Sequence, residues 1–387
     1  MIEVGLLCLG VLTAGYLRLI LLYARGWRKL VSPIQASMPS LGLSIIIPAR
    51  NESTNIVACL KSILAQDYPA HLLDIIVVDD GSEDDTIAKT RSMALPQVRV
   101  LRSEDAGEIP PGFVAFKKRA LAWGIQHAQY EHLITVDADC TFQPHWAKQI
   151  SAGWQQQTNA NLLVLPVKIN WTPQSFLTIF QALDFLSLQA ITAAAHGLGI
   201  HGMCNGANLS FRKSAFEAVG GYLGIDHRAS GDDMLLLQKI DKTFPSSVYY
   251  LKDADTIAST TAAESWWNFL QQRIRWASKA DVFQEWQIKA VLVWVYATNL
   301  GLLGGLLAGL YHSLANGDHL IITTTAVAYG TKTTVEYLFL LPVAHFMGEG
   351  KLLRYFPFAQ LPHSVYMVFA GTLSWFKQYE WKGRKLH

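Results

Sequence analysis

Acidic residues suited to cation chemistry follow three short apolar runs of the chain. Glu52 follows residues 43–47, Asp79-Asp80 follows residues 75–78, and Asp137-Ala138-Asp139 follows residues 132–136. Side chains two residues apart in a strand point to the same face, so Asp137 and Asp139 can approach one divalent cation. A hard cation held by one or two carboxylates and by phosphate oxygens stabilises a departing diphosphate, which carries two negative charges. These residues therefore predict Mg²⁺ or Mn²⁺ chemistry on a diphosphate-bearing substrate.

Each of these groups also has an ordinary structural explanation. The segment Pro48-Ala49-Arg50-Asn51-Glu52 is typical of a turn between a strand and a helix, with Asn51 or Ser53 as the helix cap. Gly81 allows a sharp turn after Asp79-Asp80, whose carboxylates can accept hydrogen bonds from a base or from ribose hydroxyls. An Asp-x-Asp triplet arises by chance in many sequences. The shared position of the three groups after predicted strands is more informative than any one of them.

The elements that must position these residues alternate between strands and helices. We expect strands at residues 43–47, 75–78, 98–101 and 132–136, separated by stretches with apolar residues at helical spacing. Such alternation predicts an α/β fold with a mostly parallel, Rossmann-like sheet buried on both faces. Ligands of these sheets collect at the carboxyl ends of the strands, where the acidic groups fall.

The motifs occur in an order that resembles the family 2 glycosyltransferases with the GT-A fold. Lys117-Lys118-Arg119-Ala120-Leu121 is similar to the family's lysine-containing segment, although Phe116 stands where glycine is usual. Residues 204–212 and 219–222 are similar to the acceptor-side segment, and Gly231-Asp232-Asp233 takes the place of the acidic Thr-Glu-Asp-type motif. Gln272-Arg273-Ile274-Arg275-Trp276 fits the family's Gln-(Gln/Arg)-x-Arg-Trp motif. The resemblance covers roughly residues 40–280, and the membrane arrangement looks like that of ceramide-glucosyltransferase-like and polysaccharide-synthase-like members.

This resemblance implies an inverting, metal-dependent transfer from a nucleotide sugar, most simply a UDP-sugar, to a hydroxyl of a lipid or other membrane-associated acceptor. It implies donor-binding roles for Pro48, Ala49, Glu52, Asp79, Asp80, Lys117 and Asp137, a metal-binding role for Asp139, and diphosphate-binding or acceptor-binding roles for Asp232, Gln272, Arg273, Arg275 and Trp276. Asp233 stands where the family has its catalytic base.

The physical chemistry of Asp233 is compatible with that role. A base that takes the acceptor proton as the oxygen attacks contributes about two to four powers of ten in rate. The alternative is a purely structural pair at a helix start, with Ser230 or Asp232 as the cap.

Residues 272, 275 and 276 share one face of a predicted helix. Arg275 there can bind a diphosphate through two hydrogen bonds, and Trp276 offers a stacking surface for the acceptor. The alternative is an interfacial helix whose aromatic residues lie at headgroup level, which we expect of Trp266 and Trp267.

The composition predicts an integral membrane protein. Hydrophobic residues make up 51% of the 387 residues and charged residues 16%, below the roughly 25% of soluble domains. Four apolar stretches, each near the ~20 residues that cross a bilayer, lie at residues 4–22, 290–310, 320–347 and 356–376. The third carries Lys332 and Glu336, which can pair on one helix face. We therefore expect an anchor at residues 1–30, the catalytic domain at 40–280, about three C-terminal membrane helices at 288–377, and a basic tail at 378–387.

Basic residues predict the orientation of the chain but leave one ambiguity. Arg25, Arg28 and Lys29 follow the anchor and place the catalytic domain in the cytoplasm, at the cell inner membrane. Both the loop with Lys351 and Arg354 and the tail after residue 376 also look cytoplasmic, although one predicted crossing separates them. One of the last segments is then re-entrant or interfacial.

Other features exclude or separate function classes. The net charge of +2 and the lack of a basic stripe with interleaved aromatics give no case for nucleic acid. Four cysteines without paired spacing indicate neither a zinc site nor a disulfide framework. A processive polysaccharide synthase is the main alternative, although about three C-terminal helices are few for a pore. A non-catalytic scaffold is a remote one, because every acidic position is filled.

Overall fold

The computed structural model describes most of the chain. The described residues are 2–32, 40–93, 96–110, 112–200, 202–277 and 286–373, together with the backbone of residues 379–381 and 384–386. Of the predicted basic tail, only these two short strands, β11 (Tyr379–Trp381) and β12 (Arg384–Leu386), are described, and the rest lies outside the described residues.

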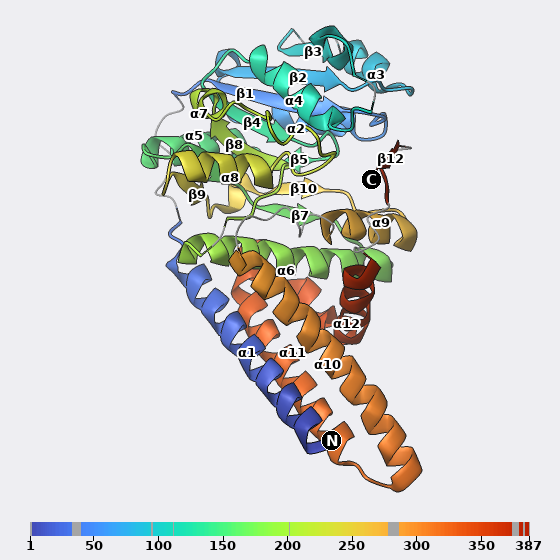
Figure 1. The fold of residues 1–387 in the computed structure, drawn as a ribbon. Helices are drawn as coiled ribbons and strands as arrows, with labels where there is room; N and C mark the ends of the chain where they lie inside the picture. The colour runs from blue at the N-terminus through green and yellow to red at the C-terminus, as the bar shows by residue number, and fades with distance from the viewer. Residues whose placement is uncertain are drawn as a thin grey trace.

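A seven-stranded sheet in the order β3-β2-β1-β4-β8-β6-β9 forms the centre of the catalytic domain (Figure 1). The strands are β1 (Leu43–Ala49), β2 (Leu73–Asp79), β3 (Val98–Arg102), β4 (His132–Val136), β6 (Leu162–Val164), β8 (Asn208–Arg212) and β9 (Val248–Tyr250). Strands β3, β2, β1 and β4 are parallel, whereas β8 runs antiparallel to both β4 and β6. The predicted mostly parallel sheet and its four predicted strands are confirmed.

Helices cover the sheet because its central strands are apolar on both faces. Ile45, Ile46 and Ile47 of β1 are fully buried. The helices of this domain are α2 (Ile56–Leu64), α3 (Thr86–Ser92), α4 (Phe116–Gln126), α5 (Trp146–Gln156), α7 (Lys213–Ala218) and α8 (Met234–Thr243). Helix α4 packs closely at Gly124, where a Cβ would lie 2.6 Å from Ile46 and 3.0 Å from Val78. Burying such strands on both sides stabilises the parallel arrangement.

A small second sheet extends the domain toward the membrane helices. It consists of β5 (Thr141–Phe142), β10 (Ala258–Thr260) and β7 (Val167–Ile169). Strand β5 begins two residues after Asp139, and β10 runs antiparallel beside it. Helix α9 (Trp266–Ala277) follows β10 and carries the Gln-Arg-x-Arg-Trp segment. This sheet therefore links the Asp-x-Asp triplet to that helix.

Three long helices project from the catalytic domain as a bundle, and a fourth lies across its base (Figure 1). The bundle contains α1 (Ile2–Lys29), α10 (Trp286–Asn316) and α11 (Leu320–Phe346), and the crosswise helix is α6 (Phe176–Leu198). By length and composition, α1, α6 and α10 can cross a membrane. Most of α6 is buried between the domain and the bundle, whereas α1 and α10 expose most of their surface. The protein is therefore membrane-associated.

Close contacts hold the bundle together. A Cβ at Gly305 would lie 2.6 Å from Thr325 Oγ1, and one at Gly309 would lie 2.7 Å from the Ile322 backbone, so α10 and α11 approach closely. Lys332 Nζ lies 2.9 Å from Glu336 Oε1, which confirms the predicted pair. The Tyr16 hydroxyl of α1 donates to the same carboxylate.

The last apolar stretch differs from the other bundle helices. It forms the 18-residue helix α12 (Phe356–Leu373) after the 3₁₀ turn η5 (Gly350–Tyr355). Helix α12 packs against α6, α9 and α10, and Figure 1 places it at the end of the bundle nearest the sheet. Strand β11, which follows it, contacts α9. Both ends of α12 thus lie on the catalytic-domain side.

Candidate active site

The predicted donor-binding residues gather at the carboxyl edge of the parallel strands. In the β1–β2 register Ala49 lies beside Asp79, and in the β1–β4 register Ile46 lies beside Thr135. Strands β1 and β2 therefore end level, and β4 ends at Val136, beside Ile47, so that Asp137 follows on the same edge. This places Pro48-Ala49, Asp79-Asp80 and Asp137 on the same rim, as the sequence predicts.

Backbone and side-chain bonds join the two loops that leave β1 and β2. The Asp80 N–H donates to Ala49 O at 2.9 Å, and Arg50 Nη1 donates to Asp80 O at 3.1 Å. Asp80 is 6% exposed, and one of its carboxylate oxygens accepts from Ser103 Oγ at 3.3 Å. Asp79 Oδ1 accepts from the Ser82 N–H at 3.0 Å, which closes the turn. Asp80 is thus held rigidly at the rim.

The helix after β1 begins later than the sequence suggests. Asn51 has a φ of 51° in the left-handed region, and its side-chain oxygen accepts from the Glu83 N–H. Helix α2 begins at Ile56 with Asn55 at the N-cap, so the prediction of Asn51 or Ser53 as cap is wrong. Asn51 is instead used to join the two loops. Glu52 accepts from Asn55 Nδ2 at 2.8 Å, beside the rim.

Lys117 connects carboxylates from two distant parts of the chain. Its Nζ lies 2.7 Å from Asp137 Oδ1, after β4, and 3.2 Å from Asp232 Oδ2, before α8. Burial alone would lower the pKa of Lys117, but the charges of Asp137 and Asp232 outweigh it and hold the pKa above its usual range. The ammonium therefore stays charged and bridges the Asp-x-Asp triplet and the Asp232-Asp233 pair.

The neighbouring Lys118 fixes the loop that leads to Asp232. Its side chain is buried, and its Nζ donates at 2.8 Å to each of the carbonyl oxygens of Ile225, Arg228 and Ser230. The local sequence around Lys118 does not reveal these partners. A buried lysine is costly unless its donors are satisfied, and three carbonyls satisfy all of them. Lys118 therefore positions Asp232 and Asp233, here called the acidic pair, without contacting their carboxylates through these bonds.

Asp233 forms the N-cap of α8 and contacts the acceptor-side segment. Its Oδ1 accepts from the Met234 N–H at 2.7 Å, and its Oδ2 accepts from the Gly206 N–H at 3.1 Å. The expectation that Ser230 or Asp232 caps this helix is wrong, because the carboxylate of Asp233 takes that position. A Cβ on Gly206 would lie 3.0 Å from Asp232 Oδ2, so this segment approaches the Asp232 carboxylate closely.

The side chain of Tyr222 is buried near the acidic pair. Burial, and then the negative charge of Asp232, raise the pKa of Tyr222 well above its usual value. The hydroxyl therefore stays protonated and can donate a hydrogen bond into the site. From the sequence, Tyr222 is recognised only as a member of the segment at residues 219–222, with no role of its own.

Asp139 lies beside β10, and its surroundings test whether the site suits a divalent cation. Its Oδ2 accepts from Thr260 Oγ1 at 3.0 Å and from Thr261 Oγ1 at 3.4 Å. After burial, the charges of Asp139 and Asp137 are the largest causes that raise the pKa values of Cys59 and Cys140, so both thiols lie near these carboxylates.

The carboxylates of Asp137 and Asp139 supply oxygen ligands, and the Asp137 side chain is 37% exposed. Such a pair fits Mg²⁺ or Mn²⁺ that is shared with a diphosphate. Among the described residues, no group of three or more His, Cys, Asp or Glu side chains could hold a metal by itself. The phosphate oxygens and water would have to complete the coordination.

The Gln-Arg-x-Arg-Trp segment of α9 has a structural use that the sequence did not reveal. Arg273 Nη2 lies 2.6 Å from Asp184 Oδ2 of α6, and both side chains are almost fully buried. Gln272 Oε1 accepts from Arg273, and the Trp276 ring lies 4.0 Å from the Arg273 guanidinium. The half-buried Arg275 shares this helix. Arg273 therefore ties α9 to α6, and the roles of these four residues toward diphosphate and acceptor stay predictions.

The acidic pair also borders the membrane bundle. Met234, which directly follows Asp233, packs against Ile288 in the first turn of α10, with Met203 and Cys204 beside them. The site therefore lies next to the place where the bundle begins.

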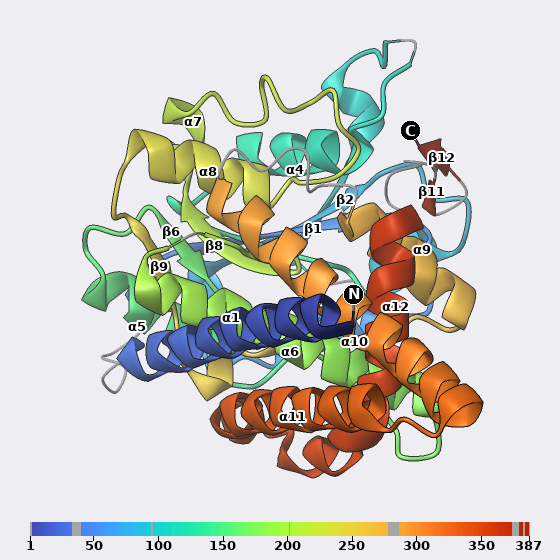
Figure 2. The same ribbon diagram turned by 60° about the horizontal axis from the view of Figure 1, so that its bottom comes forward.

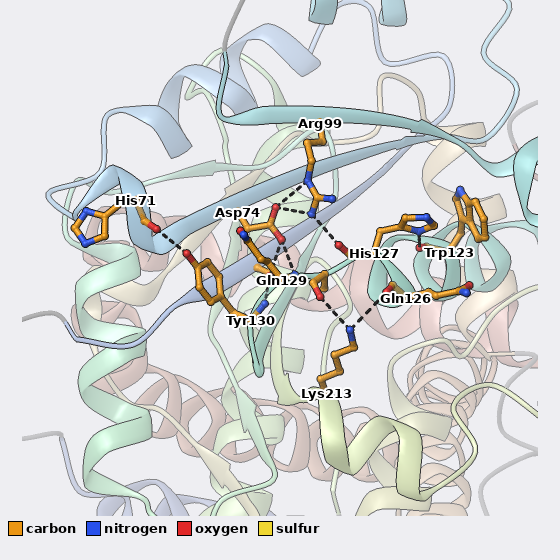
Figure 3. Close-up of polar contacts among 11 residues, drawn as sticks. His71, Asp74, Arg99, Trp123, Gln126, His127, Gln129, Tyr130 and Lys213 are labelled. Atoms are coloured by element: carbon orange, nitrogen blue, oxygen red, sulfur yellow. Dashed lines mark hydrogen bonds and ion pairs between the residues drawn. The ribbon is translucent and has the colours of Figure 1, made fainter.

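A second polar cluster, at the opposite edge of the sheet, has a purely structural arrangement (Figure 3). Asp74 of β2 is buried and lies 2.6 Å from Arg99 of β3. Its second oxygen accepts from Ser44 Oγ at 2.8 Å and from the Gln129 N–H at 2.9 Å. This cluster fixes the amino ends of the strands whose carboxyl ends carry the site.

Comparisons with known proteins identify similar sequences and a similar fold. The model of the glycosyl transferase family 2 matches residues 44–220. The 4,4'-diaponeurosporenoate glycosyltransferase of Staphylococcus aureus strain MRSA252 is 26% identical over 310 residues, 78% of this chain and 80% of that protein. The probable glycosyltransferase YdaM of Bacillus subtilis is 25% identical over 244 residues, 61% of this chain and 54% of that protein.

Solved structures support the fold. A mannosyltransferase from Pyrobaculum calidifontis, in complex with GDP-Man and Mn²⁺, superposes with a TM-score of 0.58 at 19% identity over 97% of this chain and 99% of that one. The likeness extends over the membrane helices as well as the catalytic domain. The family match and the arrangement of the sheet identify residues 44–220 as a glycosyltransferase domain of family 2.

Proposed function

We propose that this protein transfers a sugar from a nucleotide sugar, most simply a UDP-sugar, to a lipid or membrane-associated acceptor with inversion at the anomeric carbon. The observation that carries the proposal is the Lys117 bridge, which gathers Asp137 and Asp232 from segments 95 residues apart (232 − 137) at the sheet edge. Such a cluster beside a membrane bundle suits a charged donor and an apolar acceptor.

The donor-binding half follows from the rim of the sheet. Asp80, with Asp79, Glu52, Pro48 and Ala49 around it, would bind the nucleoside through its base and ribose. Asp137 and Asp139 would hold Mg²⁺ or Mn²⁺ together with the diphosphate. When bound, the cation neutralises the negative charge that develops on the leaving diphosphate. Arg275 and Gln272, with Arg273 behind them, are the candidates that would contact the diphosphate from α9.

Asp233 would act as the base. As the acceptor oxygen forms its bond to the anomeric carbon, the bond from that carbon to the diphosphate oxygen breaks and the acceptor proton moves to Asp233. The backbone bonds from Gly206 and Met234 orient the carboxylate. A carboxylate can accept about four hydrogen bonds, so two backbone bonds do not saturate it. Asp232 and Trp276 would complete the acceptor side.

A lipid acceptor is supported by the position of the site. Asp233 lies beside the first turn of α10, and the Staphylococcus aureus relative carries a terpenoid acid in its name. A processive synthase is the alternative. Three long helices beside the catalytic domain are few for a polymer pore, and the length of the product made by purified protein would separate the two functions.

The membrane topology is part of the proposal. We infer that α1, α10 and α11 cross the bilayer and that α12 turns back on the side where it begins. The basic residues after α1, in η5 and after α12 then lie on one side, which the positive-inside rule assigns to the cytoplasm of a cell inner membrane. This arrangement would agree with the charge pattern at all three places.

The Asp233→Asn variant tests the proposal, because asparagine is as good an N-cap as aspartate but is not a base. Purified wild-type protein is incubated with membrane lipids, Mn²⁺ and a panel of nucleotide sugars, and glycolipids are detected by mass spectrometry. We expect a product from wild type, loss of transfer by at least a hundredfold in the variant, and unchanged nucleotide-sugar binding. Transfer by Asp233→Asn at the wild-type rate would refute the assignment of the base.

A further inference from the structure

A cavity of about 870 Å³, including its open mouth, lies where the catalytic domain meets the membrane helices. Its walls come from α1, α6, α10, α11 and the segment from Phe356 to Met367 in α12. Figure 2 shows the bundle helices around α6 from this side. No role in the proposed transfer has been assigned to this cavity.

The walls of the cavity are apolar and electrically balanced. Most lining residues are aliphatic or aromatic, such as Leu183, Ile191 and Phe339. The two carboxylates in the wall, Asp184 and Glu336, are each paired with a buried cation. These pairs join Asp184 to Arg273 at 2.6 Å and Glu336 to Lys332 at 2.9 Å. The buried cations Arg273 and Lys332 are already paired with these carboxylates, so a bound phosphate or nucleotide would find no free positive charge in these pairs. The cavity therefore suits an uncharged chain.

One face of α10 connects the cavity to the acidic pair. Ile288, Val291 and Val295 follow the helical spacing of three and four residues. Ile288 packs against Met234, next to Asp233, whereas Val291 and Val295 line the cavity. Seven residues of helix span about 10 Å, so the upper end of the cavity lies within about two helical turns of the proposed base.

The cavity opens toward the surroundings of the bundle. Leu188 of α6 lines it and is 39% exposed, and Val291 and Val295 opposite are only half-buried. Helices α6 and α10 both pack on α1, α11 and α12, so the mouth lies between these two walls. In a bilayer, such a mouth admits a lipid chain from the side.

We propose that this cavity holds the apolar chain of a single acceptor lipid, with its polar end directed up α10 to Asp233. The proposal rests on lipid-directed glycosyl transfer and adds the ligand class: one long, uncharged hydrocarbon chain, as in a terpenoid. The headgroup stays outside, at the catalytic carboxylates. Chain length and flexibility are then selected by the membrane helices rather than by the catalytic domain.

Photolabelling of the wild-type protein tests the proposal without any mutation. The probe is a diazirine derivative of geranylgeraniol, added to full-length protein in phosphatidylcholine nanodiscs, with labelled peptides mapped by mass spectrometry. We expect labels on the wall around Leu188, Val291 and Met367, and their loss on competition with unlabelled geranylgeraniol. Labels spread evenly over outward-facing residues such as Val293 and Leu307, without competition, would overturn the proposal.

A matched pair of variants gives a second test. Val291→Trp fills the cavity, whereas Val293→Trp adds the same bulk two residues away, where the valine is 67% exposed. We expect Val291→Trp to lower both labelling and transfer to lipid at least tenfold, with hydrolysis of the nucleotide sugar in the absence of lipid unchanged. Val293→Trp should change none of the three. If the two variants have the same labelling and the same rate of transfer to lipid, the cavity is not the site of the lipid chain. If the wild-type protein neither hydrolyses a nucleotide sugar nor transfers sugar from it, the proposed function itself is refuted.

Discussion

Removing the charge of Lys117 should tighten metal binding in the donor-free protein. The Lys117 ammonium lies 2.7 Å from Asp137 Oδ1, a carboxylate proposed to hold the cation, and so occupies the space that a cation would use. Lys117→Met keeps the length of the side chain but removes its charge. Asp137 then gains freedom to bind a divalent ion.

The magnitude follows from Coulomb's law. A single charge about 5 Å from a divalent ion repels it by about 1.7 kcal/mol even at the dielectric constant of water, and by more in a partly buried site. Since about 1.4 kcal/mol is a tenfold change in affinity, Mn²⁺ should bind the variant at least about tenfold more tightly. Lys117 is 20% exposed, so loss of the pair should also lower the free energy of unfolding by about 2 to 3 kcal/mol without metal.

The assay is titration of donor-free protein with Mn²⁺, followed by electron paramagnetic resonance of the free ion. Lys148→Met is the matched control, because Lys148 pairs with Asp67 on the surface at 3.2 Å. We expect wild-type affinity in the control and lower transfer activity in Lys117→Met, since the bridge to Asp232 is lost. Mn²⁺ affinity in Lys117→Met that equals or falls below wild type would refute the reasoning.

Three further predictions concern the cap, the structural cluster and pH. Asp233→Asn keeps an acceptor for the Met234 N–H but loses the bond from the Gly206 N–H, which should cost about 1 kcal/mol of unfolding free energy by denaturant titration. Asp233→Ala should also lose the N-cap of α8, about 1 kcal/mol more. Asp74→Ala should lower that free energy by about 3 kcal/mol and leave Mn²⁺ affinity unchanged, because it unpairs Arg99 and the Ser44 hydroxyl at the far edge of the sheet. Burial, with the charge of Arg212, lowers the pKa of His132 to about 4 in the folded protein, whereas an unfolded histidine has a pKa of about 6.5. As the pH falls from about 6.5 to 4, the unfolded chain binds a proton that the folded protein does not, so the free energy of unfolding decreases. After allowing for its partial exposure, this should cost about 1 kcal/mol between pH 7 and pH 5, and a His132→Gln variant should lack that loss in pH-dependent unfolding.

The parallel half of the fold could be predicted because its strands have local signals. Continuous apolar runs such as Ile45-Ile46-Ile47 predict strands buried on both faces, and the observed β1, β2, β3 and β4 contain the predicted ranges. Strand β8 was not recognised, because Asn208 and Ser210 look like loop residues. Both are fully buried, and Trp146 and Trp154, more than fifty residues away, donate to them.

The same contrast separates the predicted from the unpredicted part of the site. The carboxylates at strand ends could be located, because the edge of a parallel sheet follows from the order of strands. Lys118 could not, since its three carbonyl partners lie 107, 110 and 112 residues further along the chain. The predicted helix caps at Asn51 and beside Asp233 were wrong, because the local sequence is compatible both with a helix cap and with a contact to a distant loop.

The Gln-Arg-x-Arg-Trp segment shows why a motif alone does not assign a role to each of its members. Arg273 is buried against Asp184, whose second oxygen lies 3.4 Å from His363 of α12, so one carboxylate joins three helices. Asp184 and His363 also line the cavity below. Removing one partner of such a buried pair typically costs about 3 to 5 kcal/mol, so substitution of Arg273 would disturb helix packing before it reported on diphosphate binding. Loss of activity in Arg273 variants therefore reports first on the junction between catalytic domain and membrane helices. Variants of Gln272, Arg275 and Trp276, which are not fully buried, are better tests of the chemistry of α9.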